Sequence, residues 1–216
     1  MKTDIEDFLL YHDVKIVKFV NMEGFYRVKS RGYKWAVFFA KPMSKDYIKR
    51  FNNFQCESKK EFNELENETD AIADLLAEYI EKRGYSACSQ SEKSNIAKGA
   101  YTDDTLTSIL PHKTIAVLSG IGWIGKNALL VTKDHGCALS TCSVLTNAPI
   151  ANSSEKVQIH DNLCGDCTIC QGFCNCFTGK KWNTNLSRED LVNVYACKKC
   201  LKCLMFCYWT KQCLEK

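Results

Sequence analysis

The sequence predicts an α/β (α+β) amino-terminal domain over residues 1–150, followed by a small cysteine-rich α+β domain over residues 164–216. Two observations favour this division. Helix-period and strand-length apolar segments alternate along the first part, and the cysteine density rises sharply after Leu163. A polar segment between them, residues 151–163, is interpreted as a linker. With 45% apolar and 25% charged residues, the 216-residue chain has the composition of a globular protein rather than a disordered one.

The amino-terminal elements alternate between helix and strand. Asp4–Tyr11 is expected to form a short helix, and Val14–Val20 a strand. Tyr33–Ala40 is rich in aromatic and β-branched residues, which predicts a buried strand that ends at Pro42. Ser44 is a suitable N-cap for the helix expected next.

The longest predicted helix spans residues 60–83, because apolar residues recur there at helical spacing and Gly84 suits the position after a helix end. We attribute its apolar stripe to core packing. Thr114–Ser119 is apolar and β-branched, which fits either a strand or a buried helix. Residues 128–146 predict a β-hairpin whose turn lies at 133–136.

Positive charge is concentrated at the carboxyl end. The chain has 29 Lys or Arg and 25 Asp or Glu, a formal net charge of +4. Residues 177–216 hold eight Lys or Arg and three Asp or Glu, so this segment carries +5 and the other 176 residues sum to −1. Such a segment fits a polyanion partner, or it offsets the charge of anionic metal clusters. We favour the second interpretation.

Neither a membrane span nor a secretory signal is expected. The longest apolar runs are far shorter than the roughly 20 residues that a membrane span needs. The chain begins with acidic residues rather than with the apolar core of a signal peptide. We therefore expect a cytoplasmic protein with no membrane partner and no DNA partner.

Fourteen cysteines are the unusual feature of the composition. In a cytosolic chain, cysteines at this density are more often metal ligands or redox centres than disulfides. Eight of them form two copies of the spacing C-x₂-C-x₂-C-x₃-C within the 44 residues 164–207. In this spacing three cysteines wrap around one iron–sulfur cube and the fourth reaches the other cube.

This crossover assigns four ligands to each of two [4Fe–4S] clusters. The first cluster takes Cys164, Cys167, Cys170 and Cys207. The second cluster takes Cys197, Cys200, Cys203 and Cys174. Zinc is the alternative metal, but a zinc site prefers two separated C-x₂-C pairs, and three evenly spaced cysteines fit a cube better.

Segment 164–207 resembles the double-cluster bacterial ferredoxin domain, although Asn175 and Tyr208 stand where proline usually follows the fourth cysteine. Each oxidised cube carries about −2, so two cubes nearly cancel the carboxyl-terminal +5. The lysines between the ligands of the second motif are expected to favour cluster reduction. They are Lys198, Lys199 and Lys202.

Six cysteines lie outside the two motifs, and we interpret them as structural thiols. They are Cys56, Cys88, Cys137, Cys142, Cys176 and Cys213. Cys176 and Cys213 lie close to the motifs in sequence, so they are also candidate spare ligands.

A glycine-rich string, Gly120-Ile-Gly122-Trp-Ile-Gly125, has the spacing G-x-G-x-x-G. It does not predict a dinucleotide-binding fold. A turn at residues 134–136 follows only nine residues after Gly125, and no acid lies near residues 140–145.

The longer string Gly120–Val131, together with Val144–Pro149 and the two cysteine motifs, resembles the epoxyqueuosine reductase family, whose members are similar to reductive dehalogenases. The resemblance is clear over residues 112–207. It implies a cobalamin-binding α/β domain followed by a two-cluster domain. It also implies an external electron donor of the ferredoxin or flavodoxin type, and tRNA as a partner.

The same resemblance implies that the glycine loop lies at the cobalamin. The residues concerned are Gly122, Trp123, Ile124, Gly125, Lys126 and Asn127. The alternative interpretation is a tight helix–strand turn packed by Trp123. Because no Asp-x-His-x-x-Gly motif is present, any cobalamin is expected to bind without a protein histidine on its cobalt.

The acid expected from the resemblance is displaced in this chain. The family carries it in an Asp-x-x-Pro-type stretch before the glycines, and without gaps that position falls at Leu106. Asp103 and Asp104 lie nearby, and His112 follows in a Pro-His-Lys string. The catalytic candidates are therefore His112 and Asp104, although a lone histidine is more often a surface or packing residue.

The sequence thus predicts an iron–sulfur oxidoreductase related to epoxyqueuosine reductase. Its two clusters are expected to relay single electrons to a cofactor or substrate held by the amino-terminal domain. Three alternatives stay open: a non-catalytic two-cluster electron carrier, an enzyme that reduces epoxyqueuosine in tRNA, and a zinc-binding interaction module.

Overall fold

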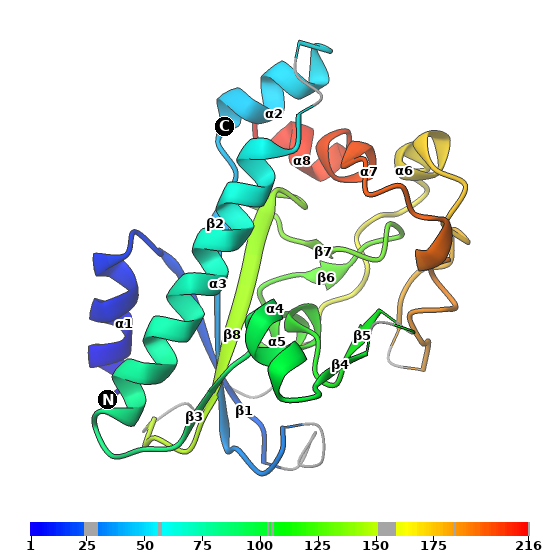
Figure 1. Cartoon of the computed structure of the whole chain (residues 1–216). Coiled ribbons are helices and arrows are strands. Elements are labelled where there is room, and N and C mark those ends of the chain that lie inside the picture. The colour runs from blue at the N-terminus through cyan, green and yellow to red at the C-terminus, as the bar shows by residue number, and fades with distance from the viewer. Residues whose placement is uncertain are drawn as a thin grey trace. The chain divides into compact units, whose positions relative to one another are not determined.

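The computed structural model describes residues 1–23, 30–55, 58–102, 104, 106–150, 159–183 and 185–215 (Figure 1). The chain groups into two compact units, each built from separate segments. The first unit comprises Met1–Lys41, Glu64–Ser119 and Ser140–Gln158, and the second comprises Pro42–Asn63, Gly120–Leu139 and Ile159–Lys216. Two segments of the predicted first domain, 42–63 and 120–139, therefore group with the cysteine-rich segment. Of the predicted linker, residues 151–158 lie outside the described part of the chain.

The first unit contains most of the regular structure. Its helices are α1 (Lys2–Tyr11), most of α3 (Lys60–Glu81), α4 (Glu92–Ala97) and α5 (His112–Leu118). Its strands are β1 (Ile16–Asn21), β2 (Trp35–Pro42), β3 (Ala87–Ser89), β4 (Tyr101–Thr102), β5 (Thr107–Ser108) and β8 (Leu139–Thr146). A four-stranded sheet has the order β1-β2-β8-β3, and β4 and β5 form a small separate sheet.

Two antiparallel pairings define the register of the four-stranded sheet. Strand β1 pairs with β2, with Ile16 opposite Ala40, and β3 pairs with β8, with Cys88 opposite Leu145. The mixed helix and strand content confirms the predicted α/β (α+β) class for the amino-terminal part.

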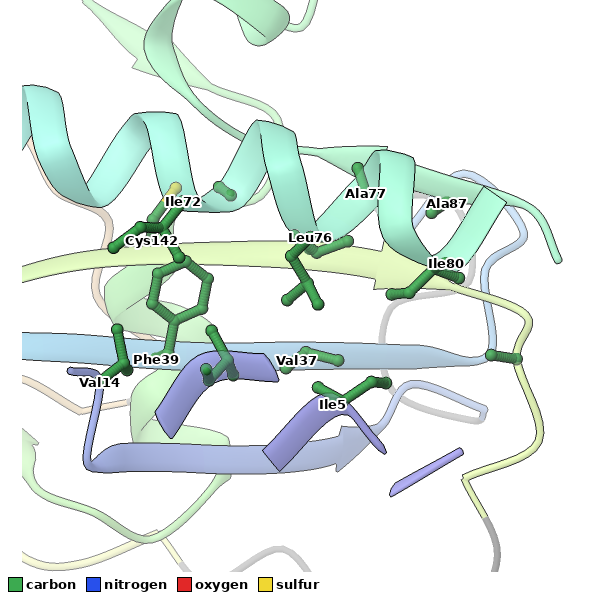
Figure 2. Close-up of a cluster of buried hydrophobic side chains, with 14 of the residues drawn as sticks. Ile5, Val14, Val37, Phe39, Ile72, Leu76, Ala77, Ile80, Ala87 and Cys142 are labelled. Atoms are coloured by element: carbon green, nitrogen blue, oxygen red, sulfur yellow. The ribbon is translucent and has the colours of Figure 1, made fainter. Parts of the chain in front are cut away.

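The core of the first unit lies between this sheet and helices α1 and α3 (Figure 2). Leu76 and Ile80 of α3 are fully buried beside Val37 and Phe39 of β2, and Ile5 of α1 joins the same cluster. Each fully buried side chain of this size contributes about 1.5–3 kcal/mol relative to its exposed state. Ile72, Leu76 and Ile80 of the stripe predicted for the long helix are therefore core as expected, whereas Leu75 of the same stripe is 46% exposed.

Strand β2 is buried on both faces. Val37 and Phe39 face the cluster of Figure 2, and Phe38, which alternates with them, is also fully buried. This explains why the segment is a continuous apolar run instead of an alternating one.

The local helix signals are confirmed. The hydroxyl of Ser44 accepts a 3.1 Å hydrogen bond from the Tyr47 amide at the start of α2 (Lys45–Asn52). Gly84 follows the end of α3 with φ +83°, a conformation that glycine adopts without strain. Thr114–Ser119, for which strand and helix were both open, lies largely in the buried helix α5.

The predicted hairpin over residues 128–146 is wrong. Strand β7 (Leu130–Val131) pairs with β6 (Trp123–Ile124), and only an isolated Thr132–Gly136 bridge closes the turn. Strand β8 instead lies between β2 and β3 in the large sheet. Seven of its eight residues are buried, which a central strand requires and a two-stranded hairpin does not provide.

The second unit has short elements. Besides α2, β6 and β7, it contains α6 (Ile169–Phe173), the 3₁₀ helix η1 (Val194–Ala196), α7 (Lys202–Met205) and α8 (Tyr208–Gln212). Phe206 packs against Phe173 with ring centroids 4.5 Å apart and against Phe51 of α2 at 6.2 Å. Within the described ranges, no helix combines the length and apolar character needed to cross a membrane.

The core of the first unit yields a stability prediction. Leu76→Ala is expected to lower the free energy of unfolding by about 3 kcal/mol, because it removes a fully buried side chain and leaves a cavity. The matched control is Leu75→Ala on the same helix, where the side chain is 46% exposed and the expected change is under about 0.5 kcal/mol. Urea unfolding followed by circular dichroism measures both, and equal losses would contradict this core.

Candidate metal centre

Each four-cysteine motif is a loop that leads into a short helix. In the first motif Cys164 and Cys167 precede α6, and Cys170 lies within it. In the second motif Cys203 lies within α7, and Cys207 is the N-cap of α8. Helices α6 and α7 contact each other, so the two motifs fold side by side.

The loop of the second motif bends sharply. Lys199 and Leu201 adopt left-handed backbone conformations, with φ of +49° and +64°, which are costly for residues with side chains. The Lys199 amide donates a 3.4 Å hydrogen bond to Cys197 Sγ. The bend turns a backbone donor toward a cysteine sulfur, and an iron–sulfur cluster's potential depends on donors of this kind.

One pocket gathers cysteines from both motifs. Cys164, Cys167 and Cys170 of the first motif line it together with Cys207 of the second. Its volume is about 340 Å³ with the open mouth included. The four thiols predicted for the first cluster thus lie around one space, and a donor set of four sulfurs fits a [4Fe–4S] cube.

The other four cysteines also lie together. Burial, together with the charges of Cys197, Cys174 and Cys200, raises the pKa of Cys203 to about 12. In the pocket, burial raises the pKa of Cys170 to about 11, with added contributions from its cysteine neighbours. Cys203 and Cys170 thus resist becoming thiolates, and bound iron would supply the positive charge that reverses this.

The fourth cysteine of each motif is contacted by one cysteine from outside the motifs. Cys137 shares a side-chain hydrogen bond with Cys207, which lowers the pKa of Cys207 to about 6 and raises that of Cys137. Cys176 shares one with Cys174, which raises the pKa of Cys176 to about 11. The sequence carries no motif signal for Cys137, so its proximity to Cys207 appears only in the fold.

The glycine loop contacts the cysteine segment within the second unit. Lys126 Nζ donates a 2.9 Å hydrogen bond to the Cys167 carbonyl. Asn127 Nδ2 lies 3.1 Å from the Cys203 carbonyl and 3.2 Å from Cys137 Sγ. This loop therefore connects both cysteine motifs.

The loop is packed tightly from both sides. A Cβ on Gly122 would overlap the Val131 carbonyl oxygen, and a Cβ on Gly125 would lie only 2.6 Å from Asn127 Oδ1 and 2.8 Å from Val131 Cγ2. Asn162 joins the loop to the first motif, since Nδ2 donates to the Ile124 carbonyl at 2.7 Å and Oδ1 accepts from the Cys164 amide at 2.9 Å.

The loop side chains predicted at a cobalamin are buried. Trp123, Ile124, Lys126 and Asn127 are at most 7% exposed. Trp123 packs edge-on against Trp209 at 5.1 Å, and its Nε1 has no hydrogen-bond partner among the described residues. The amine of Lys126 and the amide nitrogen of Asn127 already bind the cysteine segment, and the cobalamin site itself stays a prediction.

The two catalytic candidates differ in their surroundings. Asp104 is exposed, and Asp103 lies outside the described residues. His112 begins α5, and its Nδ1 lies 2.8 Å from Ser143 Oγ. The Ser143 hydroxyl donates to Gln90 Oε1 at 2.6 Å, and Gln90 Nε2 donates to the Leu110 carbonyl at 3.2 Å.

This chain of hydrogen bonds sets the tautomer of His112. Because the Ser143 hydrogen points to Gln90, its oxygen accepts from His112, which places the imidazole proton on Nδ1 and leaves the lone pair on Nε2. Burial lowers the pKa of His112 to about 4. At neutral pH the residue is an uncharged imidazole, and its catalytic role stays a prediction.

The remaining described cysteines, Cys88, Cys142 and Cys213, do not line the cysteine pocket. Cys88 Sγ accepts from Arg31 and Lys98 at 3.6 and 3.5 Å. Cys142 donates to Asp70 at 3.4 Å, and Cys213 donates to the Trp209 carbonyl at 2.9 Å. Cys56 falls outside the described residues.

The lysines expected to favour reduction lie at the surface of the second motif. Lys198 and Lys199 are exposed, and Lys202 is partly buried.

In the part of the chain that the structure describes, no three His, Cys, Asp or Glu side chains lie close enough together to hold a single metal ion.

Comparison with known proteins identifies distant relatives over part of the chain. No family model matches. An epoxyqueuosine reductase of Lactococcus garvieae is 38% identical over 74 residues, which are 34% of this chain and 20% of that protein. One of Gloeobacter violaceus is 37% identical over 75 residues, which are 35% of this chain and 21% of that protein. The matched segment thus spans about a fifth of these relatives.

The structural similarity covers more of this chain than the sequence similarity does. An epoxyqueuosine reductase solved with a tRNA-Tyr epoxyqueuosine-modified stem loop matches with a TM-score of 0.56 and 15% identity, over 97% of this chain and 66% of that one. A reductive dehalogenase, whose structure suggests a mechanism for B12-dependent dehalogenation, matches with a TM-score of 0.58 and 16% identity, over 80% of this chain and 24% of that one. The chain is a distant homologue of epoxyqueuosine reductases over part of its length, with their fold.

The tight packing of the glycine loop can be tested with an added methyl group. Gly122→Ala is expected to destabilise the protein by about 1–3 kcal/mol and to lower its iron content, because the methyl group meets the Val131 main chain. Gly172→Ala in α6 is the control, since no atom lies within 4 Å of its added Cβ. Thermal unfolding and iron analysis measure both. Equal behaviour of the two variants would contradict the packing described.

The buried imidazole predicts a pH dependence. Folded His112 has a pKa of about 4, against 6.5 for an ordinary histidine. Between these pH values the unfolded chain binds a proton that the folded chain does not, so stability is fully present above pH 6.5 and is lost as the pH falls toward 4. From pH 7 to 5 the loss from this residue is about 2 kcal/mol.

The matched variant is His112→Gln, which keeps a donor for Ser143 but does not titrate. Urea unfolding at pH 7 and 5 is expected to show a smaller acid-induced loss of stability in this variant than in the wild type. A loss of the same size in both proteins would mean that His112 is not buried as a neutral group.

Proposed function

We propose that this chain is an iron–sulfur oxidoreductase, related to epoxyqueuosine reductases, in which two [4Fe–4S] clusters relay single electrons. The observation that carries the proposal is the single pocket lined by Cys164, Cys167, Cys170 and Cys207. Cys207 belongs to the second motif, and a crossover of the fourth cysteine is the feature that separates a two-cluster domain from two independent zinc sites.

The residues of the second unit have distinct roles in this proposal. Eight cysteines would hold the two cubes, which would supply one-electron chemistry with an external donor of the ferredoxin or flavodoxin type. The thiols of Cys137 and Cys176 hydrogen-bond the fourth ligand of each motif and so adjust the electron density on its sulfur. The glycine loop fixes the two motifs relative to each other through Lys126 and Asn127.

The acceptor of the electrons is proposed from the relatives. A corrinoid would supply a strongly reducing cobalt centre, and the B12-dependent dehalogenation described for one structural neighbour favours it. The tRNA stem loop bound by another neighbour favours a modified tRNA as substrate. Because the matched segment spans only about a fifth of the curated relatives, both acceptor and substrate need direct tests.

Anaerobic reconstitution with iron and sulfide tests the proposal. We expect about eight irons per chain, and an electron paramagnetic resonance signal from two reduced clusters. A colourless protein that binds zinc instead would reject it.

Titration of the reconstituted protein with cobalamin then separates the alternatives. A base-off spectrum would indicate a cobalamin-dependent reductase, and no response would indicate a two-cluster electron carrier.

The crossover itself predicts the result of two serine substitutions. Cys207→Ser is expected to remove the first cluster and to reduce the iron content to about four per chain, since its sulfur completes the pocket. Cys213→Ser is the control, because this buried thiol follows α8 and donates to the main-chain carbonyls of Lys133 and Trp209. Its iron content is expected to stay at about eight. Equal iron loss in both variants would contradict the ligand assignment.

A further inference from the structure

Lys126 is a buried cation on the wall of the cysteine pocket. The residue is 7% exposed and lines the same pocket as the four cysteines assigned to the first cluster. Its Nζ donates a 2.9 Å hydrogen bond to the main-chain carbonyl of Cys167, one of those cysteines. The ammonium group therefore lies next to the cluster site and is held there by a ligand's own backbone.

The described contacts of Lys126 supply no negative charge. A buried ammonium is costly unless an opposite charge lies near it. Among the described residues, the ion pairs join other lysines and arginines to carboxylates, and none includes Lys126. The Cys167 carbonyl that it contacts is neutral. The negative charge that would compensate this cation is the cluster with its four thiolates.

Burial distinguishes Lys126 from the other lysines of the second unit. Lys198, Lys199 and Lys211 are exposed, so solvent and dissolved ions screen their charges over about 8–10 Å. A charge pair in a buried site is screened much less. One buried lysine on the pocket wall can thus affect a cluster more than several lysines at the surface.

We propose that Lys126 is the charge partner of the first cluster and raises its reduction potential. This rests on the proposed function, since it requires a cube on Cys164, Cys167, Cys170 and Cys207. Reduction transfers one electron from the external donor to the cube, and no covalent bond forms or breaks. The added negative charge lies beside a fixed positive charge, so the ammonium stabilises the reduced cube more than the oxidised one. Lys126 is a positioning residue in this role, because it acts through the cluster.

A redox titration followed by electron paramagnetic resonance tests the proposal on the reconstituted full chain. Lys126→Met and Lys126→Gln remove the charge, and Gln keeps a donor for the Cys167 carbonyl. In both variants we expect the equilibrium constant for reduction of one cluster to fall at least tenfold, which is 59 mV for a one-electron couple. Lys126→Arg keeps the charge and is expected to stay within threefold of the wild type.

Lys211→Met is the matched control for net charge. Lys211 lies one helical turn after Cys207, with its amide bonded to the Cys207 carbonyl at 3.0 Å, and its side chain is exposed. This variant loses the same charge near the same cluster. Its potential is expected to change less than threefold, and added salt is expected to abolish the change. The drop in the Lys126 variants is expected to persist in added salt.

Two results would overturn the proposal while the clusters remain. One is a Lys126→Gln protein that holds about eight irons and keeps both potentials within threefold of the wild type. The other is an equal drop in Lys126→Arg and Lys126→Met, which would assign the effect to packing rather than to charge. A wild-type chain that binds no iron would instead reject the proposed function, and this inference with it.

Discussion

The convergence of thiols from two distant motifs is the constraint on which the second unit depends. Helices α6, α7 and α8 have only four or five residues each, and helices this short are not stable alone in water. What orders them is the contact between α6 and α7, the packing of Phe206 against Phe51 and Phe173, and the meeting of Cys207 with the first motif. Buried thiols that meet in this way gain stability when a metal core holds them as thiolates.

The glycine loop stabilises this arrangement by hydrogen-bonding to both cysteine motifs. Its two buried polar side chains donate to a main-chain carbonyl of each motif, Lys126 to the first and Asn127 to the second. A lysine and an asparagine both satisfy a carbonyl, but only the lysine brings a charge. The loop therefore combines a mechanical role with an electrostatic one, and the absence of room for a Cβ at Gly122 shows how closely it packs.

The first unit offers a different chemistry. Its interior holds a neutral network in which Gln90, Ser143 and His112 are hydrogen-bonded, and burial keeps the imidazole uncharged at neutral pH. The Ser143 hydroxyl has an acceptor in Gln90, and the network holds one tautomer of the histidine. The apolar cluster between α1, α3 and the sheet stabilises the sheet, and strand β8 of that sheet carries Ser143 of the network.

The sequence by itself determined the features that neighbouring residues encode. The N-cap of α2, the glycine turn after α3 and the cysteine spacing each depend on residues within a few positions, which is why the sequence alone predicts them. Only the tertiary structure decided where β8 pairs, that Cys137 meets Cys207 and that segments 42–63 and 120–139 group with the cysteine motifs. These depend on contacts between residues far apart in the chain, and such contacts form only when burial selects one arrangement of the whole fold.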